Sequence, residues 1–210
     1  MKGYSILFDW DGCLANTLPQ WYLALKETFE ELGLQAKDTE LLLSMQDWAH
    51  LPKYGVTDIP EFANCLYANF YRHLDDITLN PGANEILIQL HERQAKLAIV
   101  TSSPLMKLEP VINRLGISGL FETLITKDDV TNLKPHPEPL HLAMNRMGAQ
   151  VNRALMVGDS VVDVQAGISA NIRTIWYHPS HNAEFHNAKL VSDLSPDHKI
   201  DHWQKIMSLI

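Results

Sequence analysis

Two acidic side chains, Asp9 and Asp11, follow a short apolar run and are themselves followed by Gly12. Carboxylates two residues apart can converge on one ligand when the backbone turns there, and glycine permits such a turn. A surface Asp-Gly turn is the plain alternative. A calcium-binding EF-hand loop fits poorly, because its further oxygen ligands and distant Glu are missing here.

Hydroxyl side chains and a lysine mark two further segments. Thr101 and Ser102 precede an expected helix start, where hydroxyls and free backbone amides can hold a phosphate oxygen, although such residues are also ordinary helix caps. Lys134 lies in a Lys-Pro-His-Pro segment, whose two prolines keep the chain stiff and suit a positive charge in a fixed place. A solvated loop lysine is the plain alternative.

A second acidic group lies in Gly158-Asp159-Ser160, followed by Asp163. If a helix begins here, Asp163 lies one turn after Asp159 on the same side. This spacing suits one direct magnesium ligand with a supporting carboxylate behind it.

Apolar runs and helical patterns alternate along most of the chain. Apolar runs typical of strands covered on both faces lie at 4–8, 96–100, 122–126, 154–157 and 172–177. Helical patterns lie between them, at 81–93, 106–115, 139–147 and 161–168. This order predicts an α/β fold with a doubly wound parallel sheet, and the polar clusters follow the ends of its strands.

Residues 17–79 break that rhythm. They show helical patterns at 18–32, 38–48 and 59–74, with no strand pattern among them. We expect an all-helical cap at 17–79, inserted into a core made of residues 1–16 and 80–210. An insertion at the carboxyl end of the first strand lies over the region where such sheets bind ligands. The alternative is that these helices merely extend the core.

The clusters together offer a carboxylate pair, a hydroxyl, a lysine and a second carboxylate pair around one point. Such a set supplies a nucleophile, an acid–base partner, a metal site and a cation. These are the requirements of phosphoryl transfer through an acyl phosphate.

The sequence resembles the haloacid dehalogenase-like superfamily, in the phosphatase branch that includes phosphoglycolate phosphatases and β-phosphoglucomutase and carries a helical cap. The resemblance extends from residue 4 to about residue 177. It rests on four motifs that occur in order: Asp9-x-Asp11-Gly12, Thr101, Lys134, and Gly158-Asp159-Ser160-x-x-Asp163.

The resemblance implies a role for each catalytic residue. Asp9 would attack phosphorus, and Asp11 would protonate the leaving oxygen and then activate water. Thr101 would bind a phosphoryl oxygen, and Lys134 would offset negative charge on the nucleophile and the phosphoryl group. Because Asp11 must be protonated when the leaving group departs, we expect a raised pKa there.

The resemblance also implies a cofactor and further contacts. Mg²⁺ would be held by Asp9, the backbone carbonyl of Asp11, and Asp159, with Asp163 in support. Gly12 and Ser102 would contribute to substrate binding. In the cap, we expect substrate contacts from the segment between two helices, at residues Gln46, Trp48, His50 and Lys53. The alternative is that Trp48 packs within the cap and Lys53 is solvated.

The implied activity is a magnesium-dependent phosphatase, a phosphoric monoester hydrolase acting on a small phosphorylated metabolite. A phosphomutase of the β-phosphoglucomutase kind uses the same motifs and passes the phosphoryl group to a second substrate hydroxyl. A non-catalytic module that binds phosphate or magnesium is the alternative from another class. The oligomeric state, monomer or homodimer, is left open.

The composition of the chain disfavours some classes of binding partner. The 210 residues carry 17 Lys and Arg against 25 Asp and Glu, a formal charge of −8, which disfavours nucleic acid and anionic membrane as partners. Cys13 and Cys65 form no close pair, so the sequence indicates no disulfide framework. The apolar run between Met1-Lys2 and Asp9 is too short for a signal peptide. We therefore expect a cytoplasmic protein.

The C-terminal part of the sequence is rich in histidine. The spacing of His178, His181 and His186 matches no compact zinc-binding pattern. Apolar residues at helical spacing then predict a closing helix packed on the core: Trp203, Ile206, Met207 and Ile210.

Overall fold

A six-stranded sheet forms the centre of the protein, in a computed structural model that describes residues 3–210. The strands are β1 (Ser5–Phe8), β2 (Lys96–Val100), β3 (Thr123–Ile125), β4 (Ala154–Gly158), β5 (Arg173–Tyr177) and β6 (His198–Ile200). Their order is β3-β2-β1-β4-β5-β6, and all neighbours are parallel. The predicted doubly wound parallel sheet is confirmed.

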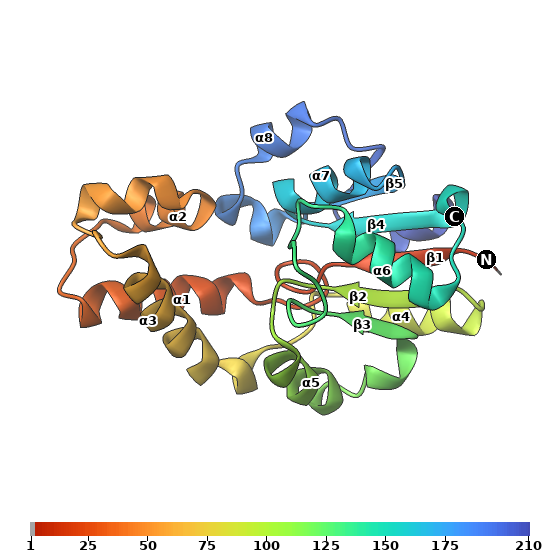
Figure 1. The fold of residues 1–210 in the computed structure, drawn as a ribbon, viewed down its shortest axis with the longest axis horizontal. Coiled ribbons are helices and arrows are strands. Elements are labelled where there is room, and N and C mark those ends of the chain that lie inside the picture. Colours follow the sequence, from red (N-terminus) through yellow and green to blue (C-terminus); the bar gives the residue numbers. More distant parts are fainter. Residues whose placement is uncertain (1–2) are drawn as a thin grey trace.

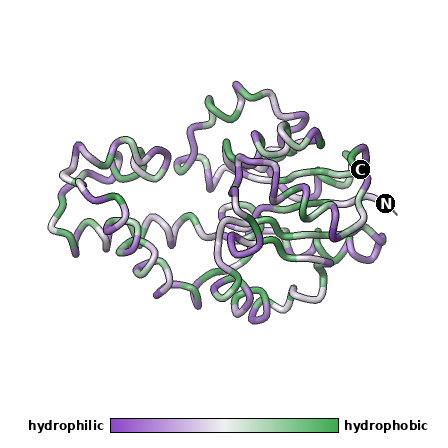
Figure 2. The backbone as a smooth tube through the Cα atoms, viewed as in Figure 1, coloured by the Kyte–Doolittle hydropathy of each residue, from purple (hydrophilic) through white to green (hydrophobic). Residues whose placement is uncertain are grey.

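Helices cover both faces of this sheet because its strands are apolar on both sides. In β1, Ile6 and Phe8 belong to one buried cluster, and Leu7 belongs to a second one. The first cluster includes side chains of α4 (Ala83–Glu92) and α5 (Leu105–Arg114), and the second includes side chains of α6 (Glu138–Met147) and α7 (Val161–Ser169). Figure 2 shows the apolar colour concentrated along the strands.

The strand order determines where ligands bind. The chain runs from β1 outward through β2 to β3, then returns to place β4 on the other side of β1. The connections therefore diverge between β1 and β4, and the crevice beyond their carboxyl ends is the usual ligand site of such sheets. Phe8 pairs with Val157, so the residues that come after β1 and β4 leave the sheet side by side.

Three helices form a cap beyond this end of the sheet, α1 (Leu18–Glu31), α2 (Asp38–Gln46) and α3 (Ile59–Arg72) (Figure 1). Helices α1 and α3 pack together, and the buried Asn69 Nδ2 donates to Thr28 Oγ1 across that interface over 3.0 Å. The exact division of the chain at residues 17 and 79 stays a prediction.

Two parts of the sequence prediction were wrong in detail. The helix expected at 38–48 ends at Gln46, because Asp47 is extended and its carboxylate accepts from Ala49 N to begin a 3₁₀ helix, Trp48–Tyr54. In the C-terminal part, the expected closing helix is a short 3₁₀ helix, Trp203–Ser208. It is preceded by α8 (Ala188–Asp193) and by the unpredicted edge strand β6.

Two further features concern the helices and the cysteines of the described residues. Between residues 3 and 210, no helix has both the length and the apolar character that crossing a membrane requires. Cys13 and Cys65 are free thiols. Met1 and Lys2, at the start of the short N-terminal run, lie outside the described residues.

Candidate active site

The loop after β1 brings the first motif to the crevice. Gly12 has φ of +76°, and a Cβ there would lie 2.1 Å from Asp159 Oδ2, so only glycine permits this approach. Gly12 N donates to Thr17 Oγ1 over 3.0 Å, which ties the loop to the start of α1. The expected substrate contact of Gly12 stays a prediction, and its role in the structure is to let two motifs meet.

Two asparagines that the sequence did not single out fasten the same loop. The buried Asn80 donates from Nδ2 to the carbonyls of Gly12 (3.0 Å) and Cys13 (2.6 Å). Asn182, from the C-terminal part of the chain, donates to the Gly12 carbonyl over 2.7 Å. The loop conformation therefore depends on side chains far away in the sequence, which no local pattern reveals.

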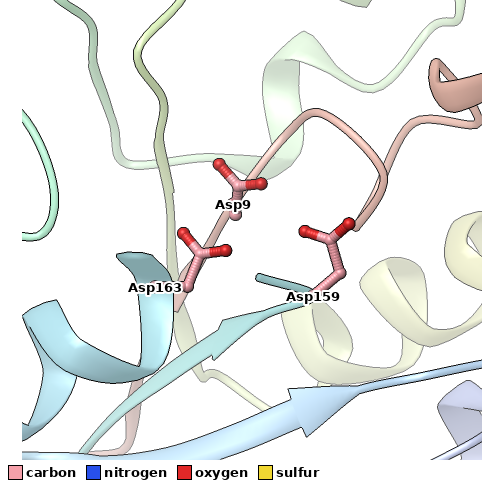
Figure 3. A group of neighbouring side chains, drawn as sticks. All are labelled: Asp9, Asp159 and Asp163. Carbon is pink, nitrogen blue, oxygen red and sulfur yellow. The ribbon is translucent and has the colours of Figure 1, made fainter. Parts of the chain in front are cut away.

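Three buried carboxylates meet at the centre of the crevice (Figure 3). Asp9, Asp159 and Asp163 each offer an oxygen within 4.8 Å of the others, and each is at most 6% exposed. Gly158 permits this packing, because a Cβ there would lie 2.3 Å from the Asp163 Cβ. Ser160 fixes Asp163, donating from N (3.1 Å) and Oγ (2.5 Å) to Oδ2 at the start of α7.

Lys134 is the ammonium group among these carboxylates. It donates to Asp9 Oδ1 (2.5 Å), Asp163 Oδ1 (2.7 Å) and the Val100 carbonyl (2.8 Å). Burial alone would lower the pKa of Lys134, but the charges of Asp163 and Asp9 hold it above its usual value. The amine is therefore protonated and has three acceptors, one for each of its hydrogens.

The carboxylates outnumber the buried positive charge. Burial, with the charge of Asp163, raises the pKa of Asp9 well above its usual value, although Lys134 opposes this shift. Both Asp159 oxygens are buried; His186 Nε2 lies 2.7 Å from Oδ2, whereas Oδ1 has no hydrogen-bond partner among the described residues. Unpaired buried carboxylate oxygens are costly unless a cation binds them, so these residues fit a hard divalent cation such as Mg²⁺.

Asp11 lies beside the carboxylate cluster and is held by two donors. Trp21 Nε1 donates to its Oδ1 over 3.2 Å, and Ser103 Oγ donates to its Oδ2 over 2.9 Å. The buried Thr101 accepts the Ser103 N–H on its Oγ1, over 3.0 Å, and so helps to order the second motif. The expected rise in the pKa of Asp11 stays a prediction.

A cavity of about 310 Å³ joins these groups to the cap. It is lined by the core residues singled out in the sequence, Asp9, Asp11, Thr101, Ser102, Lys134, Asp159 and Asp163.

The four cap residues expected to contact substrate lie in different places. Trp48 lines the cavity, and its ring packs edge-on against Phe62. Gln46 instead donates to the Glu184 carbonyl over 3.3 Å. His50 and Lys53 form an exposed pair, 3.2 Å apart, and neither lines the cavity.

His186 is a cavity residue that the sequence prediction missed. Its Nε2 lies 2.7 Å from Asp159 Oδ2, at ion-pair distance but without the alignment of a hydrogen bond. Burial would lower the pKa of His186, and the adjacent Asp159 raises it above its usual value. The spacing between His186 and the other histidines could not indicate this position, because the partner of His186 is Asp159, a carboxylate of the core.

Comparison with known proteins agrees with this geometry. The model of the family described as haloacid dehalogenase-like hydrolase matches residues 6–177. Pyrophosphatase PpaX of Oceanobacillus iheyensis is 32% identical over 174 residues, covering 81% of each chain. The phosphoglycolate phosphatase of Haemophilus influenzae (strain Rd) is 28% identical over 222 residues, covering 97% of this chain and 96% of its own.

A solved structure from Lactobacillus plantarum, provisionally named a phosphoglycolate phosphatase, has the same fold. Its TM-score is 0.83 at 23% identity, and the match covers 100% of both chains. The matched family model extends over well more than half of the chain, residues 6–177. The chain therefore belongs to the haloacid dehalogenase-like hydrolase family.

Proposed function

We propose that this enzyme is a magnesium-dependent phosphatase that hydrolyses a small phosphorylated metabolite through an aspartyl phosphate on Asp9. The observation that carries the proposal is the contact set of Lys134, whose ammonium group lies 2.5 Å from Asp9 Oδ1 at the floor of the cavity. This cation lowers the repulsion between an anionic nucleophile and an anionic phosphoryl group.

In the first half-reaction, a carboxylate oxygen of Asp9 attacks phosphorus. The bond between phosphorus and the leaving-group oxygen breaks, and Asp11 gives its proton to that oxygen. Thr101 and Ser102, which line the same cavity, donate to phosphoryl oxygens. The products are the alcohol and phosphorylated Asp9, with Asp11 left as a carboxylate.

In the second half-reaction, Asp11 accepts a proton from water as that water attacks phosphorus. The bond between phosphorus and the Asp9 oxygen breaks, inorganic phosphate leaves, and Asp11 is again protonated. The hydrogen bonds from Trp21 and Ser103 hold the Asp11 carboxyl group in one orientation for both proton transfers.

Magnesium fits the carboxylate cluster, where Asp9, Asp159 and the Asp11 backbone carbonyl would hold it and Asp163 would support them. When bound, the ion supplies positive charge that neutralises the attacking carboxylate and the phosphoryl oxygens. The buried Asp159 Oδ1, which has no hydrogen-bond partner among the described residues, supports this assignment.

The test is phosphate release from a panel of phosphate monoesters, with Mg²⁺ and with a chelator. Asp9→Asn is expected to lower kcat/KM by at least about a thousandfold, because the amide cannot form the acyl phosphate. Asp75→Asn is the matched control, since Asp75 is exposed and lies outside the cavity. Absence of release from every monoester would overturn the proposal, and unchanged release by Asp9→Asn would overturn the assigned nucleophile.

A further inference from the structure

The cap side of the cavity differs from the core side in the charge and polarity of its side chains. Its lining there is wholly uncharged and mostly apolar, made by Leu18, Trp21, Leu25, Ser44, Met45, Trp48, Leu66 and Tyr67. All the carboxylates and the cations that line the cavity come from the core. The cavity is therefore charged where the phosphoryl group would lie and apolar where the leaving group would lie.

Two of the polar groups on the cap side already have partners. Ser44 Oγ donates to the Glu40 carbonyl over 3.0 Å within α2. Trp21 Nε1 donates to Asp11 over 3.2 Å. What the cap offers a ligand is therefore chiefly the faces and edges of aromatic rings and aliphatic chains, together with the Tyr67 hydroxyl.

The cations that line the cavity are also engaged. Lys134 uses its three hydrogens on Asp9, Asp163 and the Val100 carbonyl. His186 lies against Asp159. A carboxylate on the leaving group would thus lie among the uncharged cap side chains, and none of the described residues that line the cavity places a free cation beside it. Burying an unpaired charge in this way is strongly unfavourable.

The size of the cavity limits the ligand. An apolar cavity of about 150 Å³ accommodates a benzene molecule. The present cavity, about 310 Å³, has room for a phosphoryl group and one ring or a chain of about six carbons. This is larger than a glycolate leaving group needs.

We infer that the cap side of this cavity is a subsite for an uncharged leaving group with an apolar face, so that the substrates are phosphate monoesters of such alcohols. The inference rests on the proposed phosphatase function for the reaction, but the binding preference can be measured separately. It separates this chain from the activities for which its relatives are named, on phosphoglycolate and on pyrophosphate, both of which have anionic leaving groups.

The primary experiment measures binding of methyl-, propyl- and hexylphosphonate by calorimetry in the presence of Mg²⁺. Each added methylene is expected to lower Kd by about two- to fourfold, as apolar surface is buried. Propylphosphonate is expected to bind more tightly than 3-phosphonopropionate, which has a similar length and a terminal carboxylate. Equal Kd values along the series, or tighter binding of 3-phosphonopropionate, would overturn the subsite.

Kinetics on the corresponding n-alkyl phosphates separate the subsite from the reaction. Their leaving groups have similar basicity, so a rise in kcat/KM with chain length reports the apolar contact. If phosphonate affinity increases with chain length but no ester is hydrolysed, the subsite is supported and the phosphatase function is overturned. Hydrolysis of 2-phosphoglycolate in preference to ethyl phosphate overturns the subsite and supports the phosphatase function.

Two variants in α2 test whether the chain-length dependence of binding arises at the cap wall of the cavity. Met45→Lys puts a cation on the cavity wall and is expected to flatten the chain-length dependence and to improve binding of 3-phosphonopropionate by at least about threefold. Leu43→Lys is the matched control, because Leu43 is also in α2 but is 47% exposed and does not line the cavity. Equal responses of the two variants would contradict the assigned wall.

Discussion

The indole N–H of Trp21 donates to Asp11 Oδ1 over 3.2 Å, so a side chain of the first cap helix touches the carboxylate proposed as the acid–base group. The Trp21 ring is itself fixed within the cap, stacked on Phe70 with their centroids 3.7 Å apart. A displacement of the cap would therefore remove a donor from Asp11. The orientation of the acid–base group and the position of the cap are linked through this one contact.

Replacing Trp21 by phenylalanine tests that link. Trp21→Phe keeps a ring that can stack on Phe70 but loses the donor, so kcat is expected to fall about three- to thirtyfold with a smaller change in KM. Tyr22→Phe is the control, because it alters an aromatic residue of the same helix that does not line the cavity. Steady-state kinetics measure both, and an unchanged kcat in Trp21→Phe would show that the donor does not support Asp11.

Magnesium is expected to stabilise the folded protein. Asp159 Oδ1 is buried and has no hydrogen-bond partner among the described residues, so an ion that binds this carboxylate favours the folded state. At a Mg²⁺ concentration about a hundred times its Kd, the free energy of unfolding should rise by about 2.7 kcal/mol. Thermal unfolding with Mg²⁺ and with EDTA measures the rise, which Asp159→Asn should largely abolish. Identical melting curves in wild type would contradict magnesium binding at this cluster.

Asn80 should contribute to stability and activity together. Asn80→Ala leaves the buried carbonyls of Gly12 and Cys13 without this donor, and the free energy of unfolding should fall by about 1–3 kcal/mol. Asn69→Ala, which removes a buried bond within the cap, should have a comparable cost in stability. Urea unfolding compares the two, and kinetics should show the greater loss of kcat for Asn80→Ala. Equal kcat values would mean that the loop keeps its shape without Asn80.

His178 should make stability dependent on pH. Burial, with the positive charge of Lys199 nearby, lowers the pKa of His178 to about 4. The unfolded chain then binds more protons than the folded one between about pH 6.5 and pH 4, so stability decreases as the pH falls through this range. The loss should be on the order of 1 kcal/mol, since the side chain is partly exposed.

His178→Phe should remove this part of the acid dependence while keeping a ring beside Trp176, whose centroid lies 4.4 Å from that of His178. Urea unfolding of the variant and the parent chain at several pH values measures the difference. Parallel slopes in the two proteins would show that His178 is not the group responsible.

The sequence predicted the parts of the molecule that depend on local pattern. Apolar runs revealed five of the strands, because a strand buried on both faces carries little else. The core motifs converge because parallel strands end at the same edge of a sheet. Asp9, Lys134 and Asp159 thus meet in one cavity although 125 residues separate the first two.

The parts that were missed depend on contacts between distant segments. Strand β6 has only three residues, His198–Ile200, and two of them are polar, so no apolar run marked it. The substrate contact of Gln46 stays a prediction, and the hydrogen bond from its side chain to the Glu184 carbonyl could not be read from the sequence. The spacing of the histidines along the sequence does not reveal that His186 lies beside Asp159, a carboxylate of the core. Such partners depend on how the chain folds back, which periodicity does not encode.

The match to the family ends at Tyr177, yet residues beyond that position complete the pocket. A protein shortened at Tyr177 would retain all four motifs while losing the Asn182 amide that holds the Gly12 carbonyl and the imidazole beside Asp159. The smallest unit that retains the complete pocket therefore extends at least to His186. A fragment of this enzyme, or a fusion that joins it to another domain, therefore has to include the residues up to His186.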